Sequence, residues 1–177
     1  MARPELAGWN STERSSPTGD VWFEQRVRTT KAPVERSEAG ALTLGERYWM
    51  AVESVTRRLV RVGRRGPELE LRLFGRLTLL RFGAPEIVVD ESGILSRYSI
   101  AGGLLARGPA GSITFAQTSG ADATVDLRAT VEDFLPRLAG RPGGPDWTRA
   151  IYRQVQQRLH TAISRRYFRC LIEGHPR

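Results

Sequence analysis

Very few side chains of this chain are of the types that perform catalysis or bind transition metals. The 177 residues include two histidines, His160 and His175, and one cysteine, Cys170. Two histidines without a cluster of cysteines disfavour a zinc site, and a lone cysteine excludes an internal disulfide. We therefore expect no bound metal and no cofactor, and the sequence leaves any catalytic residue unknown.

Other candidate groups have simpler structural interpretations. Asp90-Glu91 falls in a predicted hairpin loop, and Asp133 falls where a predicted strand ends. The glycines of residues 101–112 suggest a phosphate-binding loop, but the Gly-Lys-Ser/Thr ending of a P-loop is missing and a strand follows instead of a helix. His160 lies beside the apolar stripe of a predicted helix, where it is either a partly exposed residue or a polar group that lines a cavity. These residue types favour a binding protein over an enzyme.

The positive charge is concentrated in two segments. The formal net charge is +8, and 26 of the 27 basic residues are arginine. Residues 43–66 carry a net charge of +4 and residues 145–177 a net charge of +5, and both segments are predicted to contain a helix. An arginine-rich helical face would bind an anionic surface, either nucleic acid or membrane headgroups, weakly and without sequence selectivity. The candidate anion-binding residues are Arg57, Arg61, Arg64, Arg149 and Arg153.

The chain divides into a tail and one domain. Residues 1–20 are rich in serine and threonine and poor in apolar residues, which predicts a disordered tail. Residues 21–177 fit a single α+β domain of ordinary size. The longest apolar runs are far shorter than the roughly 20 residues that cross a bilayer, and the N-terminus does not resemble a signal peptide. We therefore expect a cytoplasmic protein.

The first predicted helix covers residues 43–62. Thr43 and Glu46 fit a capping box, in which each side chain bonds the backbone amide of the other residue. Apolar residues then recur with helical spacing, and Gly63 follows as a stop. The stripe consists of Tyr48, Val52, Val55, Leu59 and Val62.

Between residues 68 and 134 the apolar period changes to two, which predicts strands. About six or seven short strands follow one another, separated by turns and without intervening helices, as in an antiparallel sheet. The last strand alternates most regularly, so one face of the sheet is predicted to be buried and the other wet. Its apolar side carries Ala123, Val125, Leu127, Ala129 and Val131.

A long amphipathic helix is predicted over residues 146–172. Both helices must bury their apolar stripes, and the apolar face of the sheet is the available surface. A strongly twisted sheet of this size curls, and a curled sheet around a long helix often leaves a cavity. We expect Val125, Leu127 and Leu159 to belong to the core. The candidate ligand-binding residues around the cavity are Ala123, Ala129, Val155, Leu159 and Tyr98.

This pattern resembles the helix-grip fold of START-related and polyketide-cyclase-like proteins. The resemblance rests on the alternating residues 123–134, on the helix over residues 147–171 and, faintly, on residues 27–34. It implies a curved antiparallel sheet packed on an N-terminal helix and a long C-terminal helix, with a lipid-like or aromatic ligand in the cavity. Members of this superfamily share no universal catalytic residue, so the resemblance assigns none here.

Three functions compete at this level. The first is a module that binds a small apolar ligand between the sheet and the C-terminal helix. The second is an interaction protein whose arginine-rich face meets an anionic surface. The third is a cyclase-like or hydratase-like enzyme, for which the sequence identifies no acid or base. The oligomeric state is left open, and a homodimer is compatible with the composition.

Overall fold

The computed structural model describes residues 8–15, 21–134 and 146–174, and only the backbone of Ser15 and of residues 146–157. In this part of the chain it contains nine strands and two helices. The helices are α1 (Glu38–Val55) and α2 (Asp146–Glu173). The strands are β1 (Asn10–Ser15), β2 (Val21–Thr29), β3 (Val60–Arg65), β4 (Glu68–Leu73), β5 (Leu77–Phe82), β6 (Glu86–Val89), β7 (Gly93–Gly102), β8 (Ser112–Ser119) and β9 (Val125–Phe134).

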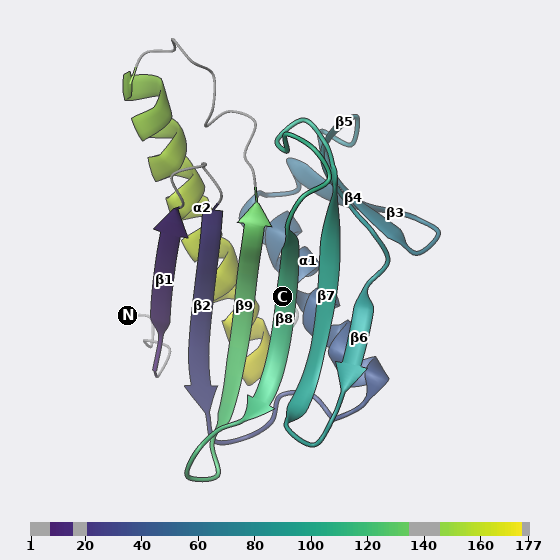
Figure 1. The fold of residues 1–177 in the computed structure, drawn as a ribbon, viewed down its shortest axis with the longest axis vertical. Coiled ribbons are helices and arrows are strands. Elements are labelled where there is room, and N and C mark those ends of the chain that lie inside the picture. The colour runs from purple at the N-terminus through teal and green to yellow at the C-terminus, as the bar shows by residue number, and fades with distance from the viewer. Residues whose placement is uncertain (1–7, 16–20, 135–145, 175–177) are drawn as a thin grey trace.

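The strands form one open antiparallel sheet in the order β1-β2-β9-β8-β7-β5-β4-β3, and β6 pairs with β7 as a branch. Both helices lie on the same side of this sheet (Figure 1). In the view of Figure 1, α1 passes behind β8, β7 and β6, and α2 passes obliquely from behind β1 and β2 to behind β9. The α+β class and the two helices on one sheet face agree with the sequence prediction and are consistent with a helix-grip arrangement. The sheet has nine strands, however, and not six or seven.

One of the two extra strands lies in the segment that was expected to be disordered. Residues Asn10–Ser15 form β1, which pairs along its whole length with β2, from Asn10 opposite Arg26 to Ser15 opposite Val21. The polar composition misleads here because β1 is an edge strand, which needs backbone hydrogen bonds more than buried side chains. The other residues of the expected tail lie outside the described ranges, apart from Gly8 and Trp9.

The second extra strand replaces the end of the first predicted helix. α1 ends at Val55, and residues Val60–Arg65 turn back as β3. Arg57 and Arg58 adopt left-handed φ angles of 50° and 61°, which end the helix without a glycine. Leu59 and Val62 fit the helical spacing only by coincidence. Val60 and Val62 instead alternate along the strand. Gly63 is therefore not a helix stop and pairs with Glu70 of β4.

The start of α1 also differs from the prediction. Ser37 is the N-cap, and its side chain accepts a hydrogen bond from the backbone N–H of Gly40 at 3.1 Å. The predicted capping box is wrong, because Thr43 lies inside the helix, where its hydroxyl donates to the Ala39 carbonyl at 2.8 Å. A cap bond satisfies one of the free N–H groups of the first turn, and Ser37 does this six residues earlier than expected.

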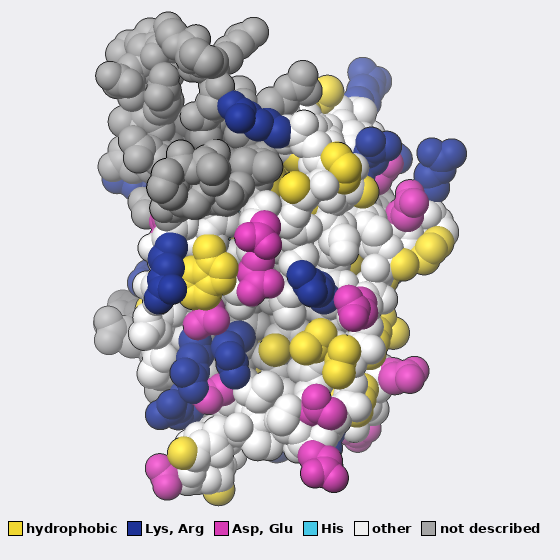
Figure 2. Space-filling view, viewed as in Figure 1, with side chains coloured by type: hydrophobic (Ala, Val, Ile, Leu, Met, Phe, Trp, Pro, Cys, Tyr) yellow, Lys and Arg dark blue, Asp and Glu magenta, His cyan; other side chains and the backbone are white. Residues whose placement is uncertain are grey.

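The two faces of the sheet differ in polarity, as the alternation predicted. On the outer face Asp126 is almost completely covered by Arg26 and Arg28, and it accepts a hydrogen bond from Arg28 Nε at 3.2 Å. These arginines, Arg26 first, lower the pKa of the Asp126 carboxyl. Figure 2 shows this face, on which basic and acidic side chains lie side by side over β2 and β9. The inner face carries the apolar residues of the same strands.

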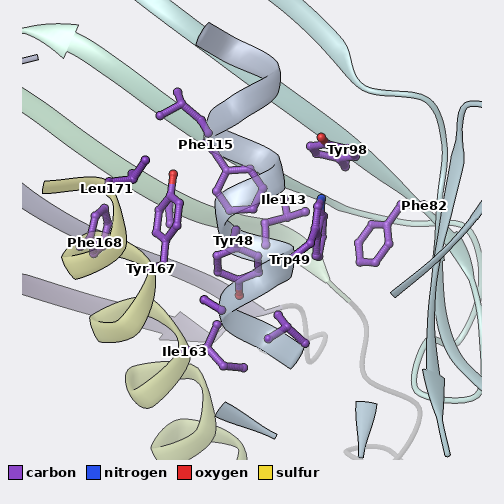
Figure 3. Packing of buried hydrophobic residues seen from close by; sticks show 14 of the residues in the cluster. Tyr48, Trp49, Phe82, Tyr98, Ile113, Phe115, Ile163, Tyr167, Phe168 and Leu171 are labelled. Carbon is purple, nitrogen blue, oxygen red and sulfur yellow. The ribbon is translucent and has the colours of Figure 1, made fainter. Parts of the chain in front are cut away.

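The core between the helices and the inner face is mainly aromatic (Figure 3). Phe115 of β8 is fully buried, and its ring centroid lies 4.6 Å from that of Tyr48 on α1 and 5.6 Å from that of Tyr167 on α2. Burial raises the pKa of both tyrosines, which are therefore uncharged at neutral pH. Leu127 is buried as predicted, Val125 is half-buried, and Leu159 is exposed. The sheet is thus held against α1 and the C-terminal half of α2 by packed rings.

Candidate functional site: buried polar groups between the sheet and α2

The inner face of β2 carries a polar side chain in the middle of an apolar row. Phe23, Gln25 and Val27 alternate toward the helices, and all three are buried. The exposed fraction of Gln25 is 0%, and neither Nε2 nor Oε1 of its amide has a hydrogen-bond partner among the described residues. Burying an amide without partners costs a free energy of roughly 1–3 kcal/mol per unsatisfied group in proteins. Such a group therefore needs an explanation.

A second buried glutamine on the same face has hydrogen-bond partners for both atoms of its side-chain amide. Gln117 of β8 donates from Nε2 to the Val34 carbonyl at 2.8 Å and accepts from the Val34 N–H at 3.3 Å. Its amide thereby fastens the segment that leads from β2 to α1. Gln25 makes no comparable bond within the part of the chain that the structure describes.

The C-terminal half of α2 contacts β2 and the residue before β1. The His160 ring lies 5.7 Å from the ring of Phe23, at one end of the row. Two helical turns further on, the Phe168 ring lies 5.9 Å from that of Trp9, the residue just before β1. Ser164 is one turn from both contacts and is 2% exposed. This spacing places Ser164 over the middle of the row, where Gln25 lies between Phe23 and Val27.

His160 adds a second unsatisfied polar group to this region. Its Nδ1 is shut off from solvent and has no hydrogen-bond partner among the described residues. Burial lowers the pKa of the imidazole, and the negative charge of Glu13 partly opposes this change. Glu13 lies opposite Phe23 in the register of β1 and β2. His160 is therefore neutral at neutral pH, with one ring nitrogen able to donate and the other able to accept.

Ala129 of β9 lies directly opposite Gln25 of β2 on one side and opposite Phe115 of β8 on the other. Of these three inward-facing residues on neighbouring strands it has the smallest side chain. Directly opposed residues on paired strands have Cβ atoms about 5 Å apart, so a larger residue here would reach the Gln25 side chain. The arrangement offers apolar walls from Phe23 and Ala129 and polar contacts from Gln25 and His160. It suits a molecule with an apolar body and one hydrogen-bonding group.

The ligand-binding residues predicted from the sequence are only partly brought together. Ala129 lies on the inner face as expected. Tyr98 also faces inward, but it packs in the core, with its hydroxyl in the place that a Cβ on Gly45 of α1 would occupy. Ala123 lies in the exposed turn before β9, with a φ of 55°, and Leu159 is 39% exposed. The side chain of Val155 lies outside the described residues.

The predicted arginine-rich helical face is wrong for its first three members. Arg57 follows α1 in the turn, and Arg61 and Arg64 lie on β3, on opposite faces of that strand. Arg64 forms an ion pair with Glu46 at 3.2 Å. The failure follows from the end of α1 at Val55, because a strand separates residues that a helix would align. The side chains of Arg149 and Arg153 lie outside the described part of the chain.

The structure also contains an open hollow at the opposite end of β2, which the sequence did not suggest. It has a volume of about 360 Å³ and is lined by residues 32–36, Gly93, residues 117–119 and Val125. It lies outside the space under α2, and the Gln117 amide at its edge is already occupied by Val34.

Two further findings concern the described residues alone. No group of three or more histidine, cysteine, aspartate or glutamate side chains there is placed to hold a metal ion. Neither α1 nor α2, as far as they are described, has a stretch long and apolar enough to cross a membrane.

Gln25 itself was missed, although the sequence contains a signal for it. Residues 21–28 alternate, and Gln25 stands on the same side as Phe23 and Val27. A polar residue at an inward position of a strand is unusual and marks either a structural bond or a binding contact. The difference between these two readings depends on what lies across from it, which the sequence does not show.

No protein-family model matches the chain, and no curated protein matches its sequence. Among solved structures, the chain is similar to the conserved protein of unknown function EF2215 from Enterococcus faecalis, with 12% identity, 91% of this chain and 76% of that chain covered, and a TM-score of 0.45. It is similar to Ara h 8.0201 with 18% identity, 83% and 97% coverage and a TM-score of 0.40. For CalU16 from Micromonospora echinospora the values are 12%, 93%, 90% and 0.28. Similarities this low leave the function to be inferred from the chain's own geometry.

Proposed function

We propose that the protein binds a small, mainly apolar molecule between the inner face of β2 and β9 and the helix α2. The Gln25 amide contacts a polar group of this ligand, and His160 offers a second hydrogen bond. Phe23 and Ala129 contact its apolar body. The observation that carries the proposal is the fully buried amide of Gln25, which has no partner among the described residues.

The unsatisfied amide of Gln25 raises the free energy of the ligand-free protein. A ligand that donates to Oε1 or accepts from Nε2 removes the penalty of the unsatisfied groups and gains the bond as well. Its apolar part gains about 25 cal/mol for each Å² removed from water. The same amide penalises a purely hydrocarbon ligand, which would leave it unsatisfied. We therefore expect an amphipathic ligand such as a fatty acid or an aromatic alcohol.

A titration of the purified full chain with dansyl-labelled undecanoic acid tests the proposal. We expect the wild-type protein to enhance and blue-shift the dansyl fluorescence to saturation. The variant Ala129→Phe should abolish this binding, because the new ring fills the space beside Gln25. Its free energy of unfolding should change by less than about 1 kcal/mol, since it occupies empty volume and not packed core.

Ala101→Phe is the matched control, because Ala101 is exposed on β7 and the substitution adds the same ring away from the site. It should leave the titration unchanged. A wild-type protein that does not bind the probe, combined with an Ala129→Phe variant destabilised by roughly 1–3 kcal/mol, would show a solid core and contradict the proposal.

A further inference from the structure

Four large apolar side chains are exposed near the start of β3, the end of β4 and the start of β5. Their exposed fractions are 67% for Phe74, 51% for Leu59, 48% for Leu77 and 44% for Leu104. The backbone N–H of Phe74 donates to the Leu59 carbonyl at 2.7 Å, and the N–H of Leu104 donates to the carbonyl of Thr78, next to Leu77, at 3.2 Å. The backbone segments of these four residues are thus neighbours, and we call the four exposed side chains the apolar rim.

Arginines outnumber acidic residues around the apolar rim, where the Glu53 carboxylate of α1 accepts from the Val62 N–H at 2.8 Å. The segments that build this end are residues 56–62, 73–79 and 103–108, and they contain five arginines and no aspartate or glutamate. Arg57 and Arg58 directly precede Leu59, and Arg76 directly precedes Leu77. None of the ion pairs among the described residues involves Arg57, Arg58, Arg61 or Arg76. Figure 2 shows basic side chains projecting over the part of the molecule that Figure 1 labels β3 to β5, with acidic side chains beside some of them.

The backbone near the apolar rim contains three non-glycine residues in an unfavourable conformation. Arg57, Arg58 and Phe74 have φ angles of 50°, 61° and 51°, a left-handed conformation that glycine and asparagine adopt most easily. Strain of this kind is concentrated at functional surfaces. Phe74 lies at the tip of the β4–β5 turn, so the strained residue is also the most exposed large apolar one of the rim.

We propose that the apolar rim docks the protein on an anionic phospholipid bilayer. Phe74 and the three leucines enter the boundary between headgroups and acyl chains, and the surrounding arginines bind the lipid phosphates. A bilayer fits better than nucleic acid, because aliphatic side chains do not stack on bases, whereas they partition into lipid. This inference is independent of the ligand site under α2, because the rim and β2 belong to opposite ends of the strand order.

Co-sedimentation of the purified full chain with vesicles tests the proposal. We expect binding to vesicles of phosphatidylcholine and phosphatidylserine, and little binding to phosphatidylcholine alone. Phe74→Asn should weaken binding about tenfold or more, because burying a phenylalanine side chain contributes that much. Asparagine tolerates the left-handed conformation, so this variant should fold at least as stably as the wild type. Arg61→Gln with Arg76→Gln should weaken binding about 25-fold, since each arginine near an anionic surface contributes about fivefold.

The matched charge control is the double variant Lys31→Gln and Arg158→Gln, which removes two exposed positive charges away from the apolar rim. It should bind vesicles within about twofold of the wild type. Urea melts of all variants establish that they are folded, and the arginine pair gives an independent test if Phe74→Asn is unstable.

Three results would overturn the proposal. The first is vesicle binding that is equal in the rim variants and the charge control. The second is binding to duplex DNA that the arginine pair abolishes and Phe74→Asn leaves intact, which would assign the surface to a polyanion. The third is a concentration-dependent dimer in sedimentation equilibrium that Phe74→Asn dissociates, without vesicle binding, which would assign the rim to a second copy of the chain.

Discussion

Phe115→Ala should lower the free energy of unfolding by roughly 3–5 kcal/mol. Phe115 is fully buried, and it is the ring that joins the three main elements of the core. Its centroid lies within 4.6–6.1 Å of four other aromatic rings, two from α1 and one each from β7 and α2. The truncation removes apolar burial and leaves a cavity that stiff neighbouring rings cannot close. Urea denaturation followed by tryptophan fluorescence measures the loss.

Phe74→Ala is the matched control for this substitution. It removes the same side chain at a position that is 67% exposed, so the free energy of unfolding should change by less than about 0.5 kcal/mol. Equal losses at the two positions would show that Phe115 does not occupy the centre of the core.

Gln25→Leu and Gln117→Leu should change stability in opposite directions. Leucine at position 25 removes an amide that has no partner among the described residues and adds apolar burial, so the free energy of unfolding should rise by roughly 1–3 kcal/mol. The same variant should lose the dansyl-labelled fatty acid, because the polar group of the probe would face an apolar wall. The Gln25→Leu variant would thus gain free energy of unfolding and lose ligand binding.

Gln117→Leu should instead lower the free energy of unfolding by roughly 1–3 kcal/mol, because it breaks both bonds to Val34 and leaves those backbone groups unsatisfied. Its probe binding should remain. The two variants have the same chemistry, similar burial and the same sheet face, so urea melts compare them directly. If Gln25→Leu were as destabilising as Gln117→Leu, Gln25 would have a structural partner and the ligand site would lose its main support.

The sheet was the most predictable part of the fold. The alternation of residues 123–131 correctly predicted the inner face of β9, including Leu127 and Ala129, because period two has only two possible faces. The edge strand β1 was missed because an edge strand needs few apolar residues. Strands with buried apolar side chains can therefore be recognised from composition, whereas strands held mainly by backbone hydrogen bonds cannot.

The final helix was predicted at nearly its observed bounds, but its buried face was displaced. Its expected stripe consisted of Ile151, Val155, Leu159, Ala162 and Ile163, and later Cys170. Of the described members, Leu159 and Ala162 are exposed, Cys170 is half-buried and only Ile163 is buried. The observed buried residues share one side of the helix and include a polar one. They are Ile163, Ser164, Tyr167, Phe168 and Leu171.

The candidate site was predictable in location but not in identity. The resemblance placed a ligand between the sheet and the C-terminal helix, and the unsatisfied polar groups lie there. Gln25 and His160 come from segments 135 residues apart, and the path of α2 brings His160 to Phe23, the neighbouring inward residue of β2. No local pattern encodes such a juxtaposition.

The side-chain amide of Gln25, observed by ¹H–¹⁵N correlation spectroscopy during the titration with dansyl-labelled undecanoic acid, tests the central claim most directly. The Gln25 and Gln117 signals are each assigned by their loss in the corresponding leucine variant. If the ligand contacts Gln25, its Nε2 signal should shift progressively to saturation, whereas the Gln117 signal should stay in place. A Gln25 signal that remains unchanged while the probe binds would contradict the account, because the ligand would then lie elsewhere on the protein.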